Sequence, residues 1–92
     1  MAISRGERRT EREPVVLALF GADAASSALD LLELVEFAWH DCYDEVTPSD
    51  EVVADILVVS GGTLEGLIRA ARLAVTDSRD LRVAADHLRA DA

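Results

Sequence analysis

The chain has 92 residues, half of them apolar, with one cysteine and a formal net charge of −9 at pH 7. This length supports one small domain with a hydrophobic core, and the apolar content excludes wholesale disorder. A single cysteine excludes an intramolecular disulfide, which fits a reducing cytosol. No apolar run approaches the roughly 18 residues that a membrane span needs, so we expect a soluble, cytoplasmic protein without membrane contact.

The negative charge is confined to the middle of the chain. Between Arg12 and Arg69 there is no Lys or Arg, but there are twelve carboxylates. Residues 1–12 carry four Arg against two Glu, and residues 69–92 carry five Arg against four Asp. A segment of one charge sign repels itself, so either the ends of the chain fold over it or a basic partner binds it. All nine basic residues are arginine, which is typical of a GC-rich bacterial genome.

The first residues predict a flexible tail. Residues 1–13 are charged, nearly free of apolar side chains and followed by Pro14. Chain termini of this composition are seldom ordered unless something ties them down. We therefore expect a charged tail over 1–13 and a single helical domain over 14–92.

The remaining elements predict an all-α bundle of four main helices. The first would begin at Ser27, where Asp30 three residues later resembles a capping box. Thr47-Pro48 supplies an N-cap and a proline at the first helical position of the second helix. Thr63 and Asp77 are N-cap residues for the last two helices. The predicted ranges are about 27–43, 48–60, 64–76 and 78–90.

One segment leaves a second fold open. Residues 55–60 are rich in β-branched side chains and run into Gly61-Gly62, so they also fit a buried strand. Such a strand could pair with another at 15–20 in a small α/β fold. Two strands are too few to bury both faces of a parallel sheet, which favours the all-α alternative.

The helix predicted at 27–43 carries an unusual acidic face. Asp41, Asp44 and Glu45 lie near its C-terminus, where carboxylates oppose the helix macrodipole, and no cation is near in sequence. On a helical wheel Phe37 falls among these acids, which is typical of a partner-binding hot spot. Alternatively, the helix is buried on two sides and Phe37 belongs to the core. The expected partner-binding surface consists of Glu33, Glu36, Phe37, His40, Asp41, Tyr43, Asp44 and Glu45.

These observations predict a small acidic module that binds a basic protein partner, as regulatory, antitoxin-like or immunity-like proteins do. One alternative is a homo-oligomer without catalysis, in which the arginine-bearing C-terminal helices of one copy meet the acidic helix of another. Residues 14–92 hold five Arg against fifteen acids, a net charge of −10 that argues against direct contact with nucleic acid.

Catalytic and metal-binding alternatives have weaker support. Glu36, His40 and Asp44 share one helical stripe and are residue types that bind metals, although a solvated acidic face explains them as well. Glu33-x-x-Glu36 followed by Glu51 and Asp55 is similar to the paired acidic helices of all-α nucleotide pyrophosphatases, which hold magnesium between carboxylates. Here the second pair is spaced i, i+4 rather than i, i+3, and no Lys or Arg is near in sequence to hold a phosphate. A magnesium-dependent nucleotide hydrolase is therefore the last alternative, and we expect no enzymatic activity, cofactor or metal.

Overall fold

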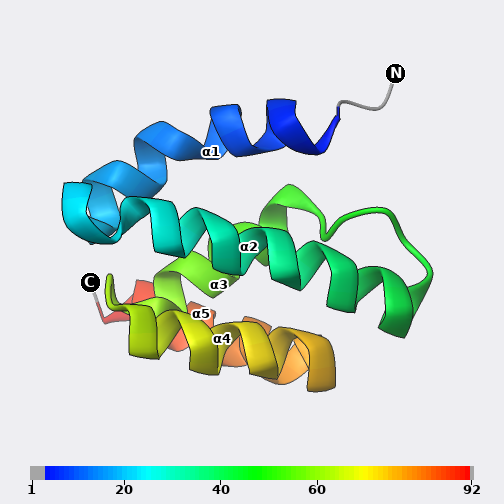
Figure 1. Ribbon diagram of the computed structural model, residues 1–92. Helices are drawn as coiled ribbons and strands as arrows, with labels where there is room; N and C mark the ends of the chain where they lie inside the picture. The colour runs from blue at the N-terminus through cyan, green and yellow to red at the C-terminus, as the bar shows by residue number, and fades with distance from the viewer. Residues whose placement is uncertain (1–3, 92) are drawn as a thin grey trace.

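Five α-helices make up the part of the chain that the computed structural model describes, residues 4–91 (Figure 1). Within this range there is no strand. The all-α class is confirmed, and the alternative with strands at 15–20 and 55–60 is wrong because both segments lie inside helices. The helices are α1 (Arg5–Phe20), α2 (Ala22–Tyr43), α3 (Asp50–Ser60), α4 (Leu64–Thr76) and α5 (Ser78–Ala90).

The additional helix, α1, replaces most of the predicted flexible tail. Residues 1–3 of that tail lie outside the described residues, but residues 4–13 form the N-cap and first half of α1. Ser4 and Glu7 form a capping box, and the helix continues through Pro14 to its C-cap at Gly21. The prediction failed because the charged side chains of α1 find their partners 21 to 35 residues further along the chain. Local composition does not reveal such pairs.

The second helix, α2, is the longest and begins five residues before its predicted start. Its N-cap is Gly21, whose φ of 85° lets the chain turn sharply out of α1. Ser27 therefore lies inside the helix, and the capping box predicted there is wrong. The helix ends near the predicted position, with Asp44 as a C-cap in the left-handed conformation.

The last three helices follow the sequence prediction closely. Ser49, and not Thr47, caps α3, so this helix begins two residues later than predicted. Thr63 and Asp77 cap α4 and α5 through side-chain hydrogen bonds to backbone N–H groups, and the ranges 64–76 and 78–90 are confirmed. A short polar residue before an apolar repeat is a strong local signal for a helix start, which explains this agreement.

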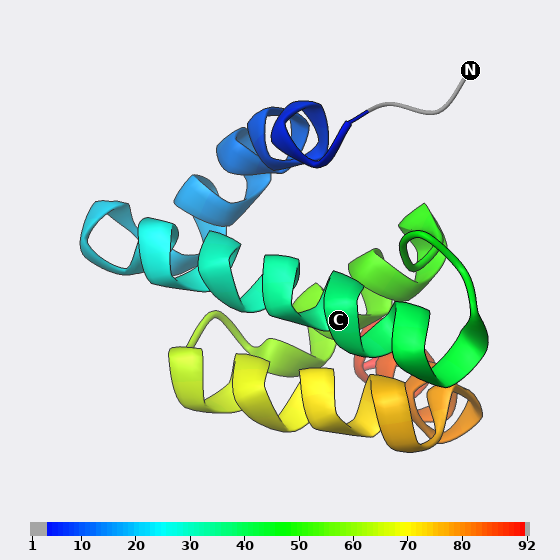
Figure 2. The same ribbon diagram turned by 45° about the vertical axis from the view of Figure 1, so that its right-hand side comes forward.

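The helices surround one core, with α2 through the middle of the molecule (Figures 1 and 2). α4 packs against one side of α2, α1 lies on another side, and α3 and α5 pack against α4 and against each other. Helices α2 to α5 each contribute a fully buried large aliphatic side chain. α1 contributes Val16, which is also fully buried, and packs mainly against α2. The large aliphatic side chains from α2 to α5 are those of Leu32, Ile56, Leu67 and Leu81.

Of the glycines in the described chain, Gly66 in the first turn of α4 has the closest backbone neighbour. A Cβ atom at this position would lie 2.0 Å from the carbonyl oxygen of Ser60 at the end of α3. Backbone cannot move aside as a flexible side chain does. The close turn between α3 and α4 therefore requires glycine.

We expect Gly66→Ala to lower the free energy of unfolding by about 2 kcal/mol or more, because the methyl group forces the two helix ends apart. Chemical denaturation monitored by circular dichroism measures the change. Gly6→Ala is the matched control, since its Cβ would meet nothing closer than 3.9 Å. Alanine there should leave stability unchanged or raise it by up to about 1 kcal/mol. Equal stability of the Gly66 variant and the native chain would contradict the packing described here.

Candidate functional site

The centre of the predicted acidic face is a buried carboxylate. Glu36 is only 1% exposed, and both of its oxygens are occupied. Arg8 donates from Nε to Oε2 at 2.5 Å and from Nη2 to Oε1 at 3.3 Å. Arg12 Nη1 and the hydroxyl of Thr47 also donate to Oε2, at 3.1 and 3.0 Å, and Arg5 Nε lies 3.4 Å from Oε1. Glu36 therefore holds α1, α2 and the segment before α3 together.

The arginines keep this carboxylate ionised in spite of its burial. Burial alone would raise the pKa of Glu36, because the charged form loses its water. Hydrogen bonds from Arg8 and Thr47 and the charges of Arg12 and Arg8 more than offset that effect and leave the pKa of Glu36 below its ordinary value. The hydrogen bond to Glu36 likewise raises the pKa of Arg8. Glu36, which we expected on the partner-binding surface, is instead a structural residue.

Glu33 is also engaged within the chain. Arg9 Nη1 lies 2.8 Å from Asp30 and 3.3 Å from Glu33, so α1 covers a second part of the acidic face. Both carboxylates remain partly open to solvent. Partly exposed pairs of this kind add little to stability, but they reduce the negative charge that a partner would meet.

An exposed hollow lies beside Phe37, between the start of α1 and the end of α2. Phe37 is 51% exposed and Val46 is 66% exposed. The guanidinium group of Arg5 lies over the Phe37 ring, 4.0 Å from its centroid. The hollow has a volume of about 380 Å³ and is lined by Arg5, Glu36, Phe37, His40, Asp41 and Val46. Of the two positions considered for Phe37, the structure places it at the surface.

The other predicted site residues divide into two groups. Tyr43 donates a hydrogen bond from its hydroxyl to the carbonyl of Ala74 at 3.2 Å, and Glu45 accepts one from the Trp39 indole at 3.0 Å. These two side chains therefore help to fix the end of α2. By contrast, the exposed side chains of His40, Asp41 and Asp44 make no hydrogen bond or ion pair with another residue in the range 4–91.

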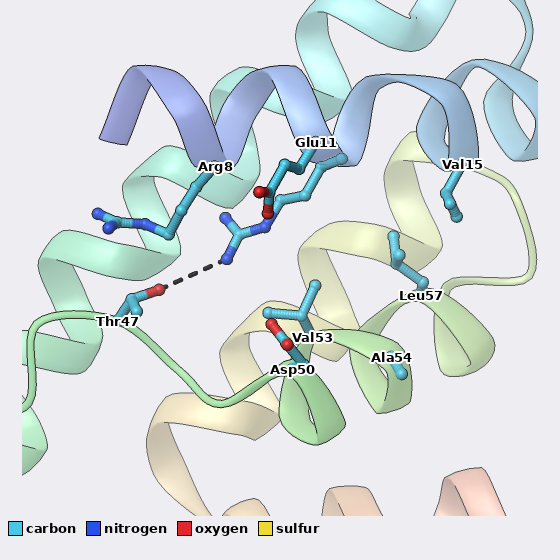
Figure 3. Close-up of a pocket in the computed structure, with 9 residues that line it drawn as sticks. Arg8, Glu11, Val15, Thr47, Asp50, Val53, Ala54 and Leu57 are labelled. Carbon is cyan, nitrogen blue, oxygen red and sulfur yellow. Dashed lines mark hydrogen bonds between the residues drawn. The ribbon is translucent and has the colours of Figure 1, made fainter. Parts of the chain in front are cut away.

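A second hollow, of about 280 Å³, lies between α1 and α3 (Figure 3). Its polar side chains gather around Thr47, which accepts a hydrogen bond from Arg12 at 3.4 Å, while Val15 and Leu57 lie at the other end. Arg12 is largely buried by its contact with Glu36, whereas Glu11 and Asp50 are exposed and form no ion pair with another described residue. Sequence analysis missed this hollow, because it depends on α1 being ordered.

A second buried carboxylate, Asp55, was also missed as a structural group. Arg89 Nη1 lies 2.8 Å from it and Arg82 Nη1 lies 3.2 Å from it, so α5 is tied to α3. The signal was present in the sequence. Asp55 interrupts the apolar stretch from Val52 to Val59, and a carboxylate inside a buried helix face needs a cationic partner.

The residues of the metal-binding alternatives do not converge. Within residues 4–91, no three His, Cys, Asp or Glu side chains come together as a metal ion would require. Comparisons with protein-family models, with curated proteins and with solved structures found no match to this chain. None of the helices in the described range combines the length and apolarity needed to cross a membrane.

We expect Glu36→Gln to lower the free energy of unfolding by about 3 kcal/mol at pH 6, because it removes the buried negative charge that the guanidinium groups of Arg8 and Arg12 contact. Glu13→Gln is the control, since Glu13 is exposed and forms no ion pair with another described residue. Urea denaturation of the three proteins measures the difference. A Glu36 variant as stable as the control variant would show that the ionic cluster contributes nothing.

The stability difference between the native chain and Glu36→Gln should depend on pH. A carboxyl whose pKa is lowered by folding stabilises the native state fully above its unfolded pKa, which is about 4.3 for glutamate. That contribution is lost as the pH falls through the lower pKa of the folded protein. The stability gap between the native chain and Glu36→Gln should therefore be widest at pH 6 and shrink below about pH 4. A gap that widens on acidification would contradict this sign.

Proposed function

We propose that this protein is a small acidic interaction module that binds a basic protein partner, in a regulatory, antitoxin-like or immunity-like role and without catalysis. The proposed contact surface is the hollow beside Phe37, together with the exposed end of α2. Its residues are Phe37, His40, Asp41, Asp44 and Val46. Glu36 lines the hollow as its buried residue, and Tyr43 fixes the end of α2 through its hydrogen bond to Ala74. Glu33 lies one turn before Phe37 on the same helix.

The observation that carries the proposal is the position of Arg5. Its guanidinium lies on one face of the Phe37 ring and 3.4 Å from a carboxylate oxygen of Glu36. An aromatic ring beside a carboxylate is a favourable environment for an arginine side chain. The hollow therefore already accommodates a guanidinium group, and half of the Phe37 surface remains exposed for a basic side chain of a partner.

The exposed charges support the same kind of partner. The carboxylates of Asp41 and Asp44 have no cation within the described chain, although they lie at the C-terminal end of a helix, where negative charge is unfavourable. Glu11 and Asp50 at the rim of the second hollow are also unpaired. Exposed acidic groups around apolar contact surface would steer a basic protein toward the module and increase its association rate.

The test is affinity capture from a lysate of the source organism at low salt, with elution by a salt gradient and identification by mass spectrometry. We expect a basic protein that is retained by the native chain and released by moderate salt. It should be lost with Phe37→Ala and with Asp41→Asn/Asp44→Asn, because one removes the apolar contact and the other the steering charge.

The controls change equally exposed residues elsewhere. Val83 is 56% exposed on α5, and Val83→Ala is the control for Phe37→Ala. Glu13→Gln/Asp23→Asn removes two exposed charges and is the control for the Asp41/Asp44 variant. Both should capture the protein as the native chain does. Capture that is equally strong with the Asp41/Asp44 variant would contradict the proposed surface. A bait that returns alone would contradict the basic partner and favour self-association.

A further inference from the structure

An apolar exposed face lies on α2 and α4. Leu34 is 61% exposed and Ile68 is 53% exposed, and they flank a shallow groove of about 190 Å³. The lining is aliphatic except for one arginine and consists of Leu31, Leu34, Val35, Ala38, Ile68, Ala71, Arg72 and Val75. An exposed face of this kind, bordered by charged residues, is typical of a protein–protein contact.

The two helices of this face are placed so that a second copy can meet them. Leu34 and Ile68 project from neighbouring helices, while Ala38 and Ala71 leave the floor of the groove low between them. α2 and α4 run in the same direction along the molecule (Figures 1 and 2). A twofold axis parallel to both helices would therefore set α2 of one copy against α4 of the other. Leu34 on α2 of each copy would then face α4 of its counterpart, which carries Ile68.

The charges at the edge of this face also fit a second copy. Arg72, one turn after Ile68 on α4, is exposed and forms no ion pair with another described residue. Asp41 lies one turn after Ala38 on α2 and is equally unpaired. When two copies of this surface meet, the unpaired cation of each copy can pair with the unpaired carboxylate of the other. A basic partner would instead be repelled by Arg72.

We propose that this chain forms a twofold-symmetric homodimer through the α2–α4 face, with Leu34 and Ile68 as the apolar contacts and Arg72 paired with Asp41 of the second copy. The dimer shares Asp41 with the surface proposed for the basic partner but otherwise uses different residues, so it does not depend on that partner. Two helices side by side give a footprint of roughly 20 Å by 20 Å, or about 800 Å² buried over both copies, which is the size of a weak, transient contact. The dimer should accordingly dissociate in the micromolar range.

Analytical ultracentrifugation over about a hundredfold range of concentration tests this dimer. We expect the native chain to change from monomer to dimer, and Ile68→Ser or Leu34→Ser to raise the dissociation constant at least about tenfold. Both side chains are mostly exposed, so these variants keep the core intact. Val83→Ser on α5, which is 56% exposed, is the matched control and should dimerise normally. A native chain that stays monomeric throughout, or equal dimerisation of all variants, overturns the proposal.

Exchanging the charges of Arg72 and Asp41 tests whether these two residues pair between the copies. Arg72→Glu and Asp41→Arg should each raise the dissociation constant at least about tenfold, and the double variant should restore it to within about threefold. A double variant as weak as either single one rejects the pairing across the twofold axis. Because Asp41 also borders the Phe37 hollow, Phe37→Ala separates the two proposals. This variant should dimerise normally even where it loses a basic partner, whereas Ile68→Ser should keep the partner and lose the dimer.

Discussion

The position of α1 depends on one buried carboxylate. Helix α1 buries one aliphatic side chain completely, Val16, and packs Phe20 partly against the core, whereas Val15, Leu17 and Leu19 are exposed. Hydrophobic contact alone therefore holds it weakly. Glu36 compensates by accepting hydrogen bonds from two α1 arginines and from Thr47. With α1 fixed in this way, Arg5 reaches the Phe37 ring and the hollow between α1 and α3 exists.

The arginines at the two ends of the chain neutralise part of the acidic segment between them. The N-terminal arginines pair with Asp30, Glu33 and Glu36, and arginines of α5 pair with Asp55 and Glu51. The ends of the chain thus fold over its acidic middle. What remains exposed and unpaired at the end of α2 is Asp41 and Asp44. The proposed partner surface is this remainder and is smaller than the acidic face that the sequence predicted.

Helices that are fixed by interactions between residues close in sequence were predicted correctly, and the helix that is fixed by distant residues was not. Thr63 and Asp77 fix α4 and α5 through hydrogen bonds within three residues, and both helices were predicted with correct bounds. α1 was missed because its stabilising partners are distant in sequence. The same missing helix explains why Glu36 was placed on the surface, since a helical wheel of α2 shows one apolar face and cannot show that α1 covers the opposite one. Phe37 was left undecided for this reason, and the structure places it at the edge of α1.

The most direct test of this account is the titration of the Glu36 carboxyl group in the folded protein, followed by the ¹³C chemical shift of its side-chain carbon. The account predicts a midpoint below the ordinary value for glutamate, about 4.3, because Arg8, Arg12 and Thr47 stabilise the ionised form against the cost of burial. A midpoint at or above that value would mean that the carboxylate is not held between the arginines, and that α1 is not fixed to α2 as described.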